Sequence, residues 1–415
     1  MVKIFVVLDG IGDRPCKILD NLTPLQYAET PNLDYFASKS KHGFVYSLNE
    51  KIAPESDEAI LALLGYDPQK YYPGRGPLEA YGAGLEFKEG YLALRVNFAT
   101  VDAKGRIIDR RVGRSLSSAE AVEFEKAINQ GVSLGYPFKF KATIGHRGVL
   151  VIKGDFSDNI SNVDPAYKKV GKFGVAVPGA NDNVHICKPL DPDKKTKLTA
   201  NIVNEFTKQS HEILNNHKLN KERKRKYLLE ANFILSRDSG IRLIELPKKN
   251  NWGAVVAMPL EIGISKLSGM NILSFKYPEN NNNDLYKNLF LGLNKTIEES
   301  IKAIKENKYN NYFIHFKETD IPGHDNKPKE KVGMIEIIDA KFFKFLRSLK
   351  DVELVVTGDH STPCELKGHS NDAVPLMHFS NEEGDVIDRF NEVECLEGSY
   401  GKMYGKEVLK KVGFE

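Results

Sequence analysis

The stretch Leu354–Ser361 (LVVTGDHS) decides the fold, because it joins a run of buried-strand character directly to a carboxylate and an imidazole. The apolar residues predict a strand covered on both faces, and Asp359 and His360 follow where that strand ends. In open α/β sheets, ligands collect outside the carboxyl ends of the strands. The pattern therefore predicts an α/β protein with a functional site at this edge of the sheet.

Two other segments repeat the arrangement. The apolar run Tyr312–Phe316 leads into Asp320 and His324, and the opening run Lys3–Leu8 leads into Asp9. Taken alone, each Asp or His is as compatible with a hydrogen-bonded residue at a strand end as with a ligand. The same pattern at the ends of several strands of one sheet favours a metal site.

The side-chain types indicate which metals such a site would bind. The candidate ligands are Asp9, Asp320, His324, Asp359, His360 and, in the following loop, His369. Oxygen and nitrogen donors without a thiolate suit Mn²⁺, Mg²⁺, Co²⁺ or an oxygen- and nitrogen-bound Zn²⁺. Two ions about 4 Å apart can hold the attacking and the leaving oxygen of a phosphoryl transfer. We therefore predict two divalent metal ions, whose identity these side chains leave open among the four, and a phosphoryl-transfer enzyme.

Ser56 is the candidate nucleophile. It precedes the helical pattern Glu58–Leu64, which Gly65 and Pro68 are predicted to end. A hydroxyl at a helix N-terminus lies beside backbone N–H groups that attract a phosphate, and coordination to a metal would lower its pKa. A serine there also caps helices without any catalytic role, so this position alone leaves both interpretations open.

The length of 415 residues favours two domains. Both ends of the chain carry α/β alternation, and the middle carries alternating strands. We predict a core domain from residues 1–75 and 250–415, with an α+β cap domain, residues 76–249, inserted between them. The glycine-rich stretch formed by Gly74–Pro77 and Gly82–Gly84 is predicted as a hinge, and Pro247–Asn251 as the returning linker. An inserted domain on two hinges can close over a site and exclude water.

Charge and composition limit the partners. The 59 basic and 56 acidic residues give a net charge of +3, which does not favour nucleic-acid or membrane-surface binding. The basic segment His217–Lys226 is predicted as a solvated helix face or loop rather than a nucleic-acid patch. The polar tract Glu279–Asp284 is predicted as a surface loop. The sequence predicts a small-molecule substrate, and it leaves the oligomeric state open.

The cysteines and the N-terminus indicate the compartment. The 4 cysteines are scattered without a CxxC pair, which suits a reducing environment. The apolar run at the N-terminus is too short for a membrane span and reads as a first strand. We therefore expect a cytoplasmic protein.

A set of longer motifs carries a family resemblance. In chain order they resemble the archaeal-type 2,3-bisphosphoglycerate-independent phosphoglycerate mutases, which belong to the alkaline phosphatase superfamily. The motifs are Pro54–Asp57, Leu63–Pro68, Gly74–Ala80, Asp109–Arg114, His146–Arg147, Ala231–Arg237, His315–Asp325 and Thr357–Pro363. Because they span nearly the whole chain, the resemblance is more specific than the short Thr-Gly-Asp-His match alone.

The resemblance implies an alkaline-phosphatase-like core and a mutase acting in glycolysis and gluconeogenesis. Ser56 would take the phosphoryl group of 3-phosphoglycerate, and the other hydroxyl of the bound glycerate would take it back. One metal would be held by Asp9, Ser56, Asp359 and His360, and the other by Asp320, His324 and His369. The implied substrate contacts are Arg114, His146, Arg147, Arg237 and Lys266. Glu55 departs from the family, which usually has a small residue before the serine.

Two alternatives differ from the mutase in what they require. A metal-dependent phosphatase or another phosphotransferase of the superfamily needs the same metal cluster but no cap that retains the dephosphorylated product. A non-catalytic binding protein on the same scaffold predicts lost ligands, yet every expected Asp, His and Ser is present.

Overall fold

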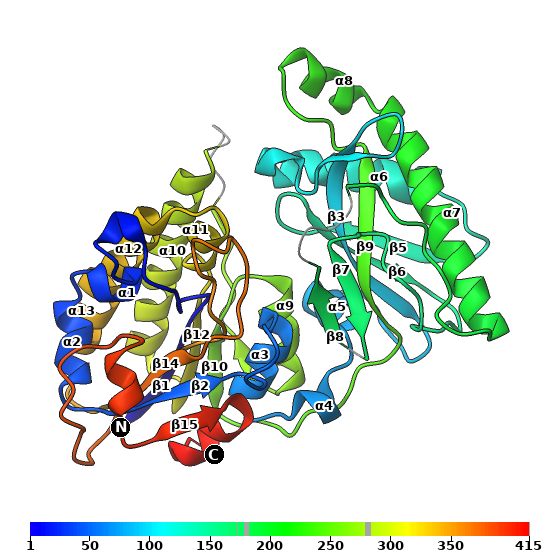
Figure 1. Cartoon of the computed structure of the whole chain (residues 1–415). Helices are drawn as coiled ribbons and strands as arrows, with labels where there is room; N and C mark the ends of the chain where they lie inside the picture. Colours follow the sequence, from blue (N-terminus) through cyan, green and yellow to red (C-terminus); the bar gives the residue numbers. More distant parts are fainter. Residues whose placement is uncertain (172, 178–181, 279–283, 415) are drawn as a thin grey trace.

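The structure is a computed structural model that describes residues 1–171, 173–177, 182–278 and 284–414. Figure 1 shows two lobes: one carries both chain ends, and the other is built from the middle of the chain. Most of the tract Glu279–Asp284 lies outside the described residues. Among the helices of the described residues, none is both long and apolar enough to cross a membrane.

The first lobe is built on an 8-stranded sheet in the order β11-β10-β12-β1-β13-β14-β2-β15. Its strands are β1 (Val2–Leu8), β2 (Lys41–Tyr46), β10 (Trp252–Val255), β11 (Asn271–Ile272), β12 (Asn311–Phe316), β13 (Val352–Gly358), β14 (Val374–Phe379) and β15 (Gly401–Tyr404). The predicted strands at the chain start and before the two Asp/His motifs are β1, β12 and β13. β1 pairs in parallel with both others, so they are neighbours in the sheet.

The register of these strands determines which residues lie together at the carboxyl edge of the sheet. Leu8 at the end of β1 lies opposite Phe316 of β12 and Gly358 of β13. The next residues on each strand, Asp9, Lys317 and Asp359, therefore leave the sheet at the same edge.

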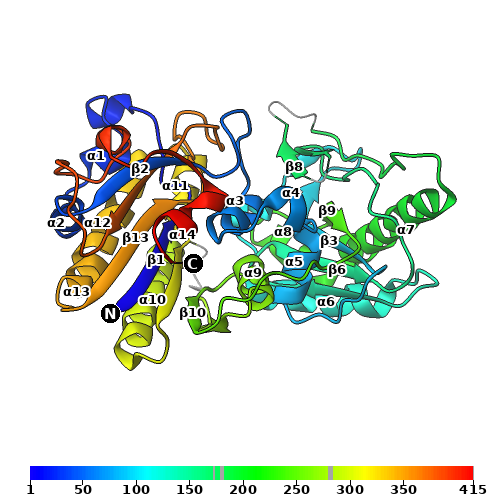
Figure 2. The same cartoon turned by 90° about the horizontal axis from the view of Figure 1, so that it is seen from below.

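Helices cover both faces of this sheet, because alternate side chains of β1 point to opposite sides. Ile4, Val6 and Leu8 pack with α2, α10 and α12, whereas Phe5 and Val7 pack with α3, α9 and α14. Figure 2 shows the sheet between these layers. The helices of this lobe are α1 (Pro24–Tyr27), α2 (Pro31–Ala37), α3 (Ser56–Leu63), α4 (Pro68–Tyr71), α9 (Pro259–Leu267), α10 (Leu285–Glu306), α11 (Asp320–His324), α12 (Pro328–Ile338), α13 (Lys344–Leu346) and α14 (Val408–Lys411).

The second lobe contains a 5-stranded sheet. Four of its strands follow the order β4-β3-β6-β5, and the fifth, β9, also pairs with β3. Its strands are β3 (Leu92–Val101), β4 (Ile107–Asp109), β5 (Phe138–Ala142), β6 (Arg147–Ile152) and β9 (Phe233–Gly240), and a separate hairpin pairs β7 (Tyr167–Val170) with β8 (Phe173–Ala176). Its helices are α5 (Arg75–Gly82), α6 (Ser118–Gly131), α7 (Lys194–Asn216) and α8 (Lys218–Arg225). The second lobe also contains the short helical segment η2 (Val112–Arg114). The corresponding short segments of the first lobe are η1 (Lys17–Leu19), η3 (Asp339–Phe343), η4 (Glu394–Glu397) and η5 (Gly405–Glu407).

The arrangement of strands agrees with an α/β fold that carries an inserted unit. Every strand of the smaller sheets lies between β2 and β10 in the chain. We propose domain boundaries at residues 75/76 and 249/250 on this basis.

The glycine-rich stretch expected to be a hinge forms the start of a packed helix, α5. α5 begins at Arg75, directly after Gly74, whose φ of 95° suits glycine. A Cβ on Gly76 would lie 2.4 Å from the carbonyl oxygen of Ala93, and one on Gly82 would lie 1.7 Å from that of Pro259. These two glycines therefore allow α5 to pack closely between β3 and α9, and the hinge stays a prediction.

Candidate active site

The ends of β1 and β13 bring Asp9, Asp359 and His360 together. The backbone N–H of Gly10 donates to Asp359 Oδ1 at 3.0 Å, which ties the two strand ends to each other. Gly10 has a φ of 60°, and a Cβ there would lie 2.7 Å from both Asp320 Oδ1 and the Thr362 hydroxyl. The loop after β1 therefore needs a glycine to pass this close to the site.

A single helical turn supplies the next candidate ligands. α11 places Asp320 and His324 on one face, with His324 Nε2 3.4 Å from Asp320 Oδ2. His369 approaches from its loop, with Nε2 3.8 Å from Asp320 Oδ1 and its ring stacked on that of His360 at 3.8 Å between centroids.

The imidazole rings of His324, His360 and His369 use their two nitrogens in the same way. In each, Nδ1 contacts a group outside the cluster, so Nε2 points to a carboxylate. The Nδ1 partners of His324, His360 and His369 are the Lys367 carbonyl at 3.2 Å, the Thr362 hydroxyl at 3.1 Å and the Pro54 carbonyl at 2.8 Å, respectively. Partners behind the ring fix a metal-binding histidine in this way, so the donor set fits divalent metal ions.

Ser56 is the first residue of α3, and Glu55 rather than Ser56 is the N-cap. The Ser56 hydroxyl oxygen lies 3.3 Å from His360 Nε2 and 3.4 Å from the Lys317 ammonium. α3 ends at Leu63 and Gly65, with a φ of 85°, follows it as expected, whereas Pro68 begins a further short helix, α4. The structure thus brings Ser56 and all six predicted Asp and His ligands to one sheet edge.

Burial and crowding shift the pKa values at this edge in opposite directions. Burial raises the pKa of Asp359 to about 7, and the neighbouring Asp9 carboxylate adds to the effect. Burial also acts to raise the pKa of Asp9, but the Lys317 ammonium 2.6 Å away and the His360 imidazole together outweigh it, and the pKa is lowered. Burial would lower the pKa of His360, yet Asp359 and Asp9 raise it to about 9. Such a set exchanges protons for a bound cation.

A cavity of about 690 Å³ opens beside Ser56, between the two lobes. Four of the predicted substrate contacts line it: Arg114, His146, Arg147 and Arg237. The fifth, Lys266, is exposed on α9 and is not among the described residues that line the cavity. Lys317, which the sequence analysis did not single out, lines the cavity instead. Its position directly after β12 is the feature of the sequence that could have indicated a role at the site.

Strand register explains why arginines gather in this cavity. Arg95 of β3 lies directly opposite Arg237 of β9, and Arg147 of β6 lies opposite Asn97, two residues further along β3. Two residues along a strand is the same face, so these guanidinium groups share one wall. Arg75 and Arg95 both contact the buried Glu79 carboxylate, at 2.7 and 3.5 Å. Glu79 thereby offsets part of their repulsion.

The predicted contacts Arg237 and Arg114 each have a partner at the cavity wall, and His146 is uncharged. The Arg237 guanidinium lies over the Tyr167 ring, 3.3 Å from its centroid. Arg114 pairs with Asp325 at 2.6 Å, directly after His324. Burial, and then the Arg147 charge, hold the pKa of His146 well below its ordinary value, so this ring is neutral.

The unusual Glu55 carboxylate points to an imidazole and a guanidinium rather than standing free beside Ser56. It lies 3.6 Å from His369 Nδ1 and 3.8 Å from Arg75 Nη1. Burial acts to raise its pKa, but His369, Arg237 and Arg75 lower it to about 2. The carboxylate is therefore ionised, and its charge is balanced within the cavity wall.

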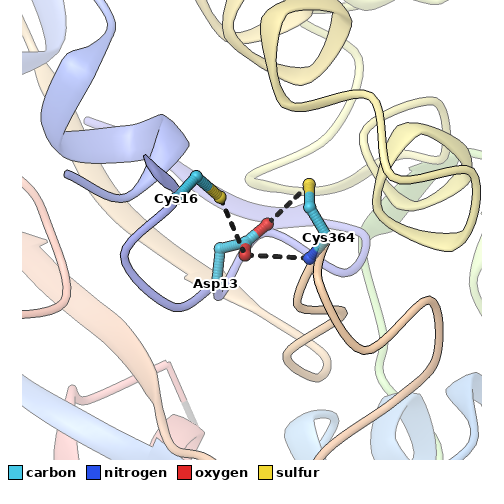
Figure 3. A group of neighbouring side chains, drawn as sticks. All are labelled: Asp13, Cys16 and Cys364. Atoms are coloured by element: carbon cyan, nitrogen blue, oxygen red, sulfur yellow. Dashed lines mark hydrogen bonds between the residues drawn. The ribbon is translucent and has the colours of Figure 1, made fainter. Parts of the chain in front are cut away.

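A second group of potential ligands, Asp13, Cys16 and Cys364, lies in the first lobe (Figure 3). Asp13 already accepts hydrogen bonds from the Cys364 backbone N–H at 3.0 Å and the Cys364 thiol at 3.1 Å. The fully buried Lys331 ammonium lies 2.8 Å from Asp13 Oδ2 and supplies a positive charge there. Burial raises the thiol pKa of Cys16 to about 11, so thiolate ligands are disfavoured. We interpret the group as a structural ion pair.

Comparison with known proteins assigns the class and the family. Residues 263–415 match the family model described as the metalloenzyme superfamily, so the Asp/His edge belongs to a metalloenzyme that binds divalent metal ions on an alkaline-phosphatase-like α/β core. Residues 37–220 match the model described as 2,3-bisphosphoglycerate-independent phosphoglycerate mutase. The chain belongs to the 2,3-bisphosphoglycerate-independent phosphoglycerate mutase family.

Relatives and solved structures agree over the full length. Proteins named 2,3-bisphosphoglycerate-independent phosphoglycerate mutase from Aeropyrum pernix and Pyrococcus furiosus are 40% and 38% identical, and each alignment covers 98% of this chain and 97% and 95% of the relative. A cofactor-independent phosphoglycerate mutase structure from Thermoplasma acidophilum is 30% identical with a TM-score of 0.59, covering 100% of this chain and 99% of that one. A Pyrococcus horikoshii protein structure is 29% identical with a TM-score of 0.75, covering 99% and 96%. The predicted family and fold class are confirmed.

Proposed function

We propose that this chain interconverts 3-phosphoglycerate and 2-phosphoglycerate without added bisphosphoglycerate, as a glycolytic and gluconeogenic enzyme of the cytoplasm. The position of Ser56 carries the proposal. Its hydroxyl is 3.3 Å from His360 in the Asp/His cluster, and it also lines the arginine-rich cavity. One oxygen therefore faces both a metal site and a site for an anionic substrate.

We assign two ions, manganese first, to the Asp/His edge. One is held by Asp9, Ser56, Asp359 and His360, and the other by Asp320, His324 and His369. When bound, the ions polarise phosphoryl oxygens and lower the pKa of the serine hydroxyl. The imidazole orientation supports this assignment, because every Nε2 already points toward a carboxylate.

The chain's own groups carry the transfer. Ser56 Oγ gives up its proton and attacks phosphorus, the bond from phosphorus to the C3 oxygen of 3-phosphoglycerate breaks, and that oxygen takes up a proton as glycerate forms. The C2 hydroxyl of the retained glycerate then loses its proton and attacks the phosphoserine, the bond from phosphorus to Ser56 Oγ breaks, and Oγ takes up a proton to restore the free hydroxyl. The Lys317 ammonium, 3.4 Å from Ser56 Oγ, stabilises negative charge that develops on this oxygen in both steps.

The cavity must hold glycerate while its two hydroxyls exchange places. Arg114, Arg147 and Arg237 present planar donors suited to the phosphate and carboxylate of the substrate. The neutral His146 contributes a hydrogen bond rather than a charge. Lys266 has no part in this proposal, because it is exposed on α9.

A trapping experiment tests the covalent step. The enzyme is mixed with 3-phosphoglycerate carrying ³²P, quenched in acid, digested and analysed by mass spectrometry. We expect phosphate on the peptide that contains Ser56. Labelling of another residue, or conversion without any labelled peptide at a quench time shorter than one turnover, would exclude the phosphoserine route.

A further inference from the structure

The buried imidazole of His315 lies at the sheet edge that carries the candidate metal ligands, but it is not one of the ligands that the family resemblance implies. It lies on β12 with 4% of its surface exposed, one position before Phe316. Its Nε2 has no hydrogen-bond partner among the described residues, and the same is true of the buried Asp359 Oδ2. An orphaned ring nitrogen in the interior is costly unless a further group satisfies it.

The ring nitrogen faces two of the candidate metal ligands. His315 Nε2 lies 3.9 Å from Asp9 Oδ2 and 4.0 Å from Asp359 Oδ2. These separations are too long for hydrogen bonds. They suit donors that share one ion, since metal bonds of about 2.0–2.2 Å place neighbouring ligand atoms about 3–4 Å apart.

The other side of the ring is also arranged as it is in metal-binding histidines. His315 Nδ1 lies 3.7 Å from Oε1 of Glu261, a carboxylate buried on α9. A carboxylate behind an imidazole directs the opposite nitrogen toward a metal and raises its basicity. Glu261 thus lies behind the His315 ring, at a longer distance than the 2.8–3.2 Å contacts behind the other three rings.

We propose that His315 is a metal ligand whose Nε2 binds the ion shared by Asp9 and Asp359. This inference deepens the metal site of the proposed function. The ion would then contact His315 in addition to Asp9, Ser56, Asp359 and His360, a mixed oxygen and nitrogen set suited to Mn²⁺, Co²⁺ or Zn²⁺ rather than Mg²⁺.

The Lys317 ammonium also approaches this position, 2.6 Å from Asp9 Oδ2. It has two further partners, Glu261 Oε1 at 3.2 Å and Ser56 Oγ at 3.4 Å. The ammonium therefore keeps anionic and polar neighbours when an ion takes up the Asp9 carboxylate.

Titration of the metal-free full chain with Co²⁺, followed by visible absorption and calorimetry, tests the proposal without phosphoglycerate. We expect His315→Asn to weaken one Co²⁺ ion at least about tenfold and to change its absorption, with a smaller loss for Glu261→Gln. The matched control is His378→Asn, because His378 is also buried and contacts a carboxylate, Glu353, at 3.0 Å. Equal affinities and spectra for wild type and His315→Asn would overturn the proposal.

A measurement on unaltered protein guards against a variant that fails to fold. Pulsed electron paramagnetic resonance of the Mn²⁺-loaded chain, with ¹⁵N-labelled histidine, counts the imidazole nitrogens bound to metal. We expect about four bound imidazole nitrogens, one each from His315, His324, His360 and His369, whereas a count of about three, the number without His315, would exclude His315. A chain that binds metal through His315 but does not isomerise phosphoglycerate would refute the proposed function and leave this inference standing.

Discussion

Ser56 Oγ and His360 Nε2 lie 3.3 Å apart although 304 positions separate them in the chain. The contact arises because α3 begins beside the end of β13, at the edge where β1 and β12 also end. The start of a helix thus brings the proposed nucleophile to a cluster of strand-end carboxylates and imidazoles.

Removal of the Ser56 hydroxyl is expected to abolish phosphoryl transfer. Ser56→Ala should lower kcat by a factor of at least about 10³, because no other group can form the covalent intermediate. Folding, followed by circular dichroism, and metal content should stay close to wild type. Ser210→Ala, a buried serine of α7, is the control. Substantial activity in Ser56→Ala would contradict the covalent mechanism.

The Arg237 guanidinium over Tyr167 is expected to act in substrate binding. Arg237→Lys keeps the charge but loses the planar donor pair and the stacked geometry, so KM should rise about tenfold. Steady-state kinetics in both directions measure the effect. Arg242→Lys, an exposed arginine two residues past Gly240, should behave as wild type. An unchanged KM in Arg237→Lys would remove this residue from the cavity's anion contacts.

The buried ion pair of Lys331 and Asp13 is expected to dominate local stability. Lys331 is fully buried with its ammonium 2.8 Å from Asp13, so Lys331→Met leaves an unpaired carboxylate in the interior. We expect the free energy of unfolding to fall by about 3–5 kcal/mol, measured by urea denaturation. Lys402→Met, which breaks the exposed contact to Glu50, should change little. Equal midpoints for both variants would mean that the buried pair contributes nothing.

The neutral His146 predicts a dependence of stability on pH. Burial first, and then Arg147, hold its pKa well below the ordinary value, so the folded ring stays unprotonated. The unfolded chain takes up this proton as the pH falls through about 6.5, and it therefore binds more protons than the folded chain. Stability should decrease below about pH 6.5, by up to about 1.4 kcal/mol per pH unit from this group.

His146→Gln should reduce that slope, whereas His185→Gln, at an exposed site, should not. Urea unfolding with chelator present, between pH 7.5 and 5.5, compares them. The same slope in wild type and His146→Gln would show that this histidine is protonated in the folded state.

Local patterns predict the sheet edge well. The apolar runs at Lys3–Leu8, Tyr312–Phe316 and Leu354–Val356 are recovered as the buried strands β1, β12 and β13. Each run is continuous because parallel strands are covered on both faces, and each ends at the polar residues that the site needs. Position along the chain was therefore enough to locate these side chains.

Features that depend on distant partners could not be predicted in this way. The basic segment His217–Lys226 reads as a solvated surface, yet Arg223 in it is 1% exposed and donates to the Leu229 carbonyl and the Ser115 hydroxyl. Glu261 and His315 show no local signal either, because their meaning comes from a contact between α9 and β12. Likewise, the close packing at Gly76 and Gly82 depends on neighbours that lie elsewhere in the chain.

The most direct test is conversion of 3-phosphoglycerate by the metal-replete chain, with no bisphosphoglycerate present. 2-Phosphoglycerate and free phosphate are followed in the same sample by ³¹P magnetic resonance, and a parallel sample contains EDTA. The account predicts isomer formation without release of phosphate, lost on chelation. Release of phosphate without isomer would contradict it, because the metal edge would then serve a phosphatase and the arginine-lined cavity would not retain glycerate.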